Sequence, residues 1–307
     1  MGAGVSDYND IIAEEGLEQA ACEAIYTHLA SSLSWQIGDF AHLREGSLCR
    51  AHPPSATSGL VCSEHPLEKC PYLPYPPITD ADRWASLLKN YSKKTRSHIG
   101  YYERRLKGIF EVENGLVESQ DQLPDAMTAL FELHRRRWNK RWLPGVLGSS
   151  QMQSFHRAVA KDFLTRGWLR LHYLILDGDY QAVLYCFAFG DRTCYYQGGF
   201  EPTMARHSLG SVLTATAIKQ SINESKLEFD FLRGDEPYKE RWTQGHSRMN
   251  IRRLVAKRGT PMLRWAQQAH ILEHKIETRF KDFMHHAYTK DQPKKVSAAE
   301  SEGESDH

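Results

Sequence analysis

Three strand-like runs joined by tight turns constrain the fold of this 307-residue chain more than any other feature. They are WLRLHYLIL, AVLYCFAF and TCYYQGGF, at residues 168–176, 182–189 and 193–200. Asp177-Gly178 and Gly190-Asp191 lie between them, and such dipeptides favour hairpin turns because they tolerate positive φ. The middle of the chain is therefore predicted to be an antiparallel meander.

Helical periodicity precedes and follows this meander. Apolar residues at three- and four-residue steps predict helices at residues 7–33, 80–88, 92–106, 125–142, 150–166, 209–223 and 261–287. Further strands are predicted at residues 34–40, 59–63, 108–114, 227–231 and 248–256, and the proline-rich run 70–80 is expected to be extended. The sequence thus predicts a mixed α/β (α+β) fold, with a largely antiparallel sheet flanked by helices.

Charge is balanced over the whole chain but unevenly distributed. The net charge of +1 indicates no nucleic-acid binder, and the acidic residues 288–307 are expected to form a disordered tail. The predicted helix 92–106 and its end are rich in bases: Lys93, Lys94, Arg96, Arg104, Arg105 and Lys107. This run is either a solvated helix face or a surface that attracts phosphate.

Hydropathy and the N-terminal residues predict a cytoplasmic protein. No run approaches the roughly 20 apolar residues that span a bilayer, and the N-terminus lacks the pattern of a secretory signal. We therefore expect no membrane span and reduced thiols. Cys49, Cys62 and Cys70 lie near His52 and His65, but they include no C-x-x-C pair, so no metal site is predicted.

The segment that follows the third meander strand is a candidate phosphate site. A helix start offers unpaired N–H groups and a partial positive charge, and Gly210 would let a ligand approach closely. The simpler alternative is a helix capped by Ser208, with the glycine unrelated to binding. The candidate carrier-binding residues are Gly199, His207, Ser208, Leu209, Gly210 and Ser211.

Two blocks of residues resemble a known family. The first runs from Gly199-Phe200-Glu201-Pro202 to Ser208, Gly210 and Leu213, and the second is DFLRGDEPYK, from Asp230 to Lys239. Together with the order meander, helix and strand, they resemble the GNAT superfamily of acyltransferases. Within it they are similar to the CelD/BioF2-like acetyltransferases, a group related to the Fem-type aminoacyl transferases. The resemblance covers residues 67–258.

The resemblance implies both an architecture and an activity. It implies a GNAT domain at residues 111–287, after a partial N-terminal GNAT-like lobe and linker at residues 1–110. The expected activity is N-acyl transfer from acyl-CoA, a co-substrate rather than a bound cofactor, to an amine acceptor such as an amino sugar or envelope precursor. An incomplete lobe would expose an apolar face, which a homodimer could cover.

Acyl transfer needs a docked thioester, a polarised carbonyl and a proton acceptor. Asp230 is the first candidate for the base, ahead of Asp235 and Glu236, because a partly buried carboxylate can have a raised pKa. It could equally form an ion pair with Arg233 or Lys239. Tyr238 could donate a proton to the leaving thiolate or simply pack. The candidate catalytic residues are Asp230, Arg233, Asp235, Tyr238 and Lys239.

Two other functions remain open at this point. One is a tRNA-dependent aminoacyl transferase of the Fem type, favoured by the basic helix 92–106 and disfavoured by the near-neutral net charge. The other is a non-catalytic GNAT-like binding module.

Overall fold

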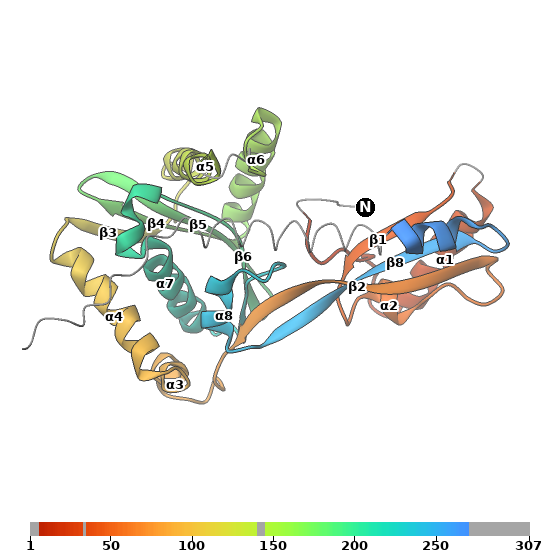
Figure 1. Ribbon diagram of the computed structural model, residues 1–307, viewed down its shortest axis with the longest axis horizontal. Helices are drawn as coiled ribbons and strands as arrows, with labels where there is room; N and C mark the ends of the chain where they lie inside the picture. The colour runs from red at the N-terminus through yellow and green to blue at the C-terminus, as the bar shows by residue number, and fades with distance from the viewer. Residues whose placement is uncertain (1–5, 33–34, 140–144, 270–307) are drawn as a thin grey trace, which may run out of the picture.

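A single sheet runs through the described part of the molecule. The computed structural model describes residues 6–32, 35–139 and 145–269. Within them the strand order is β1-β8-β2-β7-β6-β5-β4-β3. Figure 1 shows a wide half, where helices lie on both faces of the sheet, and a narrow half that extends to one side.

The wide half contains the predicted meander. Its strands are β3 (Val112–Leu116), β4 (Leu169–Leu176), β5 (Asp179–Phe189) and β6 (Arg192–Phe200), and consecutive strands among these four are antiparallel. Asp177 and Gly178 have φ of 51° and 86° at the first turn, and Gly190 has φ of 54° at the second. The turn prediction is therefore confirmed, and a short strand, β7 (Glu228–Asp230), joins β6 in parallel.

Helices cover both faces of this half. One face packs on α5 (Leu123–Asn139) and α6 (Ser150–Thr165), around buried residues such as Leu130 and Tyr185. The other face packs against α3 (Arg83–Lys89), α4 (Lys93–Lys107), α7 (Leu209–Asn223) and α8 (Pro237–Thr243). The predicted α/β fold, with a largely antiparallel sheet flanked by helices, is confirmed. None of the described helices has the length and apolar character needed to cross a bilayer.

The narrow half combines segments from both ends of the chain. It contains α1 (Glu18–Ser31), β1 (Gly38–Leu43), α2 (Leu48–Ala51), β2 (Leu60–Pro74) and β8 (Ser247–Lys257). Its own core is built around Cys22, Tyr26, Phe40 and Val255. β2 pairs with β8 over most of its length and with β7 at residues 72–74, so it passes from one half to the other.

Several predicted elements were wrong in extent. The first helix begins at Glu18 rather than residue 7, because the preceding segment makes tertiary hydrogen bonds: the Asp10 carboxylate accepts from the amides of Leu48 and Cys49. Residues 70–74 of the proline-rich run complete β2, whose register shifts between Pro66 and Lys69. α8 was missed inside a charged loop.

The remaining predictions fall partly outside the described residues. Of the helix predicted at 261–287, residues 262–269 are helical and the rest lie beyond the described part. The predicted tail, residues 288–307, lies wholly outside the described residues. The tail and the helix beyond residue 269 therefore stay predictions.

Gly199 allows α5 to pack directly against β6. A Cβ at this position would lie 2.8 Å from the His134 amide nitrogen, 2.8 Å from Leu133 Cβ and 3.0 Å from the Leu130 carbonyl oxygen. Most of these atoms are backbone, so they can move away only if the helix shifts. The missing side chain at Gly199 therefore has a packing explanation that does not involve a ligand.

We predict that Gly199→Ala lowers the free energy of unfolding by about 1–3 kcal/mol, because overpacking forces backbone shifts. Urea denaturation measures the change. Gly46→Ala is the matched control, since a Cβ there would meet nothing within 4 Å. Equal stability of the two variants would show that α5 does not depend on Gly199.

Candidate functional site

β6 and β7 separate part-way along the sheet. They pair in parallel only at residues 192–194 and 228–230. Tyr185 pairs with Gln197 and Cys186 with Tyr195, so Tyr196 is an extra residue in β6, and such a residue makes a β-bulge. Beyond the bulge β6 continues to Phe200, and this edge has no partner strand among the described residues. We call this region the opening.

Aromatic residues and one arginine surround the opening. The ring centroids of Tyr195 and Tyr238 are 6.3 Å apart, and Phe231 contacts both rings. The Arg137 guanidinium lies 4.7 Å from the Phe200 ring centroid. Burial raises the pKa of Tyr195 to about 12 and that of Tyr238 well above its ordinary value. Both phenols are therefore neutral at pH 7 and can donate a hydrogen bond.

The first turn of α7 begins close to the end of β6. A 3₁₀ segment, Pro202–His207, leads to Ser208, which has φ of 54° and makes no side-chain cap. The simple capping alternative is therefore wrong. The amides of Ser211 and Val212 donate to the Ser208 carbonyl. Those of Leu209 and Gly210 have no backbone partner in the described chain, as expected for a helix start that is free to bind an anion.

The other candidate carrier-binding residues have different surroundings. His207 is 2% exposed, its ring contacts Phe110, and its Nε2 accepts from Arg206 Nε at 3.0 Å. Burial, with the charges of Arg206 and Arg105, lowers the pKa of His207. Leu209 is also buried, whereas Ser211 is half-buried. The structure thus places His207 beneath the loop rather than at its surface.

Asp230 ends β7 with 0% of its surface exposed. The Tyr8 hydroxyl lies 2.9 and 2.8 Å from its two carboxylate oxygens, and the Leu232 amide donates to Oδ1 at 2.8 Å. Arg248 Nη1 is 3.5 Å away, so the expected ion pair exists, but its partner is neither Arg233 nor Lys239. Burial raises the pKa of Asp230, and the Tyr8 hydrogen bond opposes that rise.

Arg233 and Lys239 instead hold the loop after β7. Arg233 Nε is 3.3 Å from Asp7 Oδ1, and its Nη1 is 2.8 Å from His42 Nε2. Lys239 is 4% exposed, and its Nζ donates to the Arg233 carbonyl at 2.6 Å. It also pairs with Glu236 at 2.9 Å. Asp235 is exposed and lies apart from this network.

Sequence reasoning missed the N-terminal contribution to this site. Asp7 and Tyr8 lie outside the blocks that resemble the family, and the sequence separates Tyr8 from Asp230 by 222 positions. Burial raises the pKa of Asp7, and the neighbouring Arg233 opposes that rise. No local pattern indicates such a contact, because Tyr8 precedes α1 in an irregular segment.

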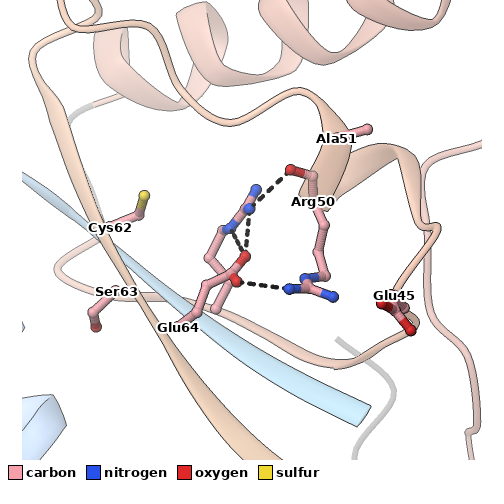
Figure 2. A pocket seen from close by; sticks show the side chains of 7 residues that line it. Glu45, Arg50, Ala51, Cys62, Ser63 and Glu64 are labelled. Carbon is pink, nitrogen blue, oxygen red and sulfur yellow. Dashed lines mark hydrogen bonds and ion pairs between the residues drawn. The ribbon is translucent and has the colours of Figure 1, made fainter. Parts of the chain in front are cut away.

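Several hollows lie on the described surface, one of them, of about 200 Å³, between α4, β3, β4 and α7. A groove of about 780 Å³ runs beside the opening between α5, the start of β5 and residues 201–204. A third hollow, of about 350 Å³, lies in the narrow half, where Figure 2 shows Glu64 beside Arg50. Glu64 also pairs with Arg253. Arg253 is 3% exposed and also donates to the Cys49 carbonyl, so these charges support the narrow half internally. Among the described residues, no His, Cys, Asp and Glu cluster could hold a metal.

Comparison with solved structures places this fold among known ones. FemX superposes with a TM-score of 0.54 at 10% identity, covering 79% of this chain and 77% of that chain. The C-terminal domain of a putative lysylphosphatidylglycerol synthetase from Agrobacterium fabrum has a TM-score of 0.47 at 14% identity. The match covers 76% of this chain and 72% of that chain. A conserved protein of unknown function from Bacteroides thetaiotaomicron has a TM-score of 0.47 at 9% identity, over 65% of this chain and 62% of that chain. This chain therefore spans less than two thirds of that protein.

The sequence matches a family model, although no curated protein matches it. Residues 93–240, which contain the opening, α7 and most of α8, match the acetyltransferase (GNAT) domain family. The structural similarity to FemX agrees with this match at the level of the fold. Just under half of the chain, residues 93–240, is therefore similar to GNAT-type acetyltransferase domains.

Proposed function

We propose that this protein is an N-acyltransferase, which transfers an acyl group from acyl-CoA to an amine acceptor. The separation of β6 from β7 at the Tyr196 bulge carries this proposal. A free strand edge can pair with the amides of a pantetheine arm, in the way that extended peptides add to a sheet. The unpaired amides of Leu209 and Gly210 would then bind the pyrophosphate.

In the proposed transfer the acceptor amine loses one proton and the leaving thiolate gains one. The acceptor nitrogen attacks the thioester carbonyl, so a C–N bond forms, the C–S bond breaks and a thiolate leaves. Tyr238 lies at the opening and its hydroxyl is neutral at pH 7, so it can donate a hydrogen bond that stabilises the leaving thiolate, which then takes a proton from water. The attacking nitrogen must lose its proton to a second group.

Asp230 can accept that proton only through Tyr8. Its carboxylate has no exposed surface, and the Tyr8 hydroxyl covers both oxygens. In the proposed relay the amine proton passes to the Tyr8 oxygen while the Tyr8 proton passes to Asp230. The raised pKa of Asp230 favours this, because an effective base has a pKa closer to neutrality.

Fem-type aminoacyl transfer from tRNA is the second candidate. The exposed bases of α4 are the observation that favours it. The net charge of +1 disfavours it, because RNA affinity derives largely from phosphate neutralisation.

We predict that Gly210→Asp weakens acetyl-CoA binding about a hundredfold or more, since facing like charges cost several kcal/mol. Isothermal titration calorimetry measures the dissociation constant. Gly210→Ala is the control for size, because a Cβ there would lie 3.4 Å from the Phe200 ring, an ordinary contact. Unchanged binding in Gly210→Asp would refute the assignment of this loop.

We also predict that Tyr8→Phe and Asp230→Asn each reduce turnover about a hundredfold and that the double variant is no slower. The assay is thiol release from acetyl-CoA with a panel of amines, corrected for the folded fraction. Tyr173→Phe is the matched control, because its hydroxyl makes the same kind of bond, 2.9 Å to Glu113, away from the opening. Additive losses in the double variant would contradict the relay.

A further inference from the structure

The basic residues of α4 form a distinct surface. The helix carries six Lys and Arg residues and a single acid, Glu103, although the whole chain has a net charge of only +1. Five of these six are exposed, and Arg105 is half-buried. We call the exposed bases of α4 the basic face; its members are Lys93, Lys94, Arg96, Arg104 and Lys107.

The basic face lies opposite the side of α4 that packs on the domain. Lys93, Arg96, Arg104 and Lys107 follow one another at steps of three, eight and three residues, which places them on one stripe of a helix. Leu106 is 1% exposed and packs in the core that also contains α7. The bases therefore make no contribution to the core.

Helix stability explains the bases at the end of α4, because Arg104, Arg105 and Lys107 lie in the last turn, where the helix dipole favours cations. It does not explain those at the start. Lys93 and Lys94 occupy the first turn, which contains no acid, and cations there oppose the helix dipole at a cost of about 0.3–1 kcal/mol each. Gly100, in the middle of the stripe, costs about 1 kcal/mol more than alanine. A Cβ at Gly100 would meet only the Arg104 side chain, at 2.9 Å from Nη1, so core packing does not require this glycine.

The basic face leads to the candidate thioester site. Figure 1 shows α4 beside α7 on one face of the sheet. The end of α4 lies near the loop before α7. The ring of Phe110, just after α4, contacts the His207 ring, and the positive charge of Arg105 helps to lower the pKa of His207. Lys93 is twelve residues from Arg105, or roughly 18 Å along the helix. A single CoA bound at α7 would therefore leave the first-turn bases without a partner.

We propose that the basic face docks an acidic carrier protein, whose phosphopantetheine arm delivers the acyl thioester to the opening. This inference rests on the proposed acyl transfer. Complementary charge over the length of one helix suits a small acidic protein and would accelerate its docking. RNA fits less well, because the chain as a whole provides no positive field to attract a long polyanion.

The test is the binding of a fluorescently labelled, acidic holo-acyl carrier protein, measured by anisotropy at about 50 mM salt, where screening is weak. Lys93→Glu/Lys94→Glu should weaken its binding by at least about tenfold while changing acetyl-CoA binding less than twofold. The control is Arg135→Glu/Lys161→Glu, which makes the same charge change at exposed residues of α5 and α6 and should bind like wild type.

Two results would overturn the proposal. In the first, the carrier protein binds both double variants equally, or does not bind wild type although acetyl-CoA does. In the second, labelled tRNA binds wild type and loses affinity in Lys93→Glu/Lys94→Glu, whereas the carrier protein binds none of the proteins. Failure of wild type to bind acetyl-CoA as well would count against the proposed function itself, so the two failures are distinguishable.

Discussion

One extra residue in β6 determines how the wide half of the molecule is arranged. The bulge at Tyr196 follows the three residue pairs that join β6 to β7. Buried backbone N–H and C=O groups need partners, so a strand edge left open inside a domain is suited to receive a ligand. α5 packs on one side of this edge against Gly199, and α7 begins just beyond it. The match to the GNAT domain family covers all of these elements.

A buried network of polar side chains closes the site toward the narrow half. Tyr8 bonds to Asp230, Asp7 pairs with Arg233, and β2 continues through both halves of the sheet. Burying charges in this way costs free energy unless they are paired, which explains why the N-terminal segment bonds here instead of extending α1. The same contacts give the proposed relay its geometry, so folding and chemistry depend on the same residues.

The sequence indicated elements whose signals are local. The turn dipeptides located the meander, and apolar spacing gave α7 its observed bounds, Leu209–Asn223. β2 was underestimated because three prolines interrupt its pattern, the first of which, Pro66, lies at a register shift. The DFLRGDEPYK block located Asp230, but its partners Tyr8 and Arg248 come from distant segments. Such contacts arise from the tertiary fold, and a single sequence carries no local signal for them.

Hydrogen exchange on the full chain, with and without acetyl-CoA, tests the central claim most directly. We predict slower exchange at the amides of residues 195–200 and 209–211, where the thioester arm and the pyrophosphate would bind. Exchange at residues 45–51 and 62–64, around the hollow of the narrow half, should not change. Saturable binding of acetyl-CoA with unchanged exchange along β6 and at the start of α7 would contradict the account.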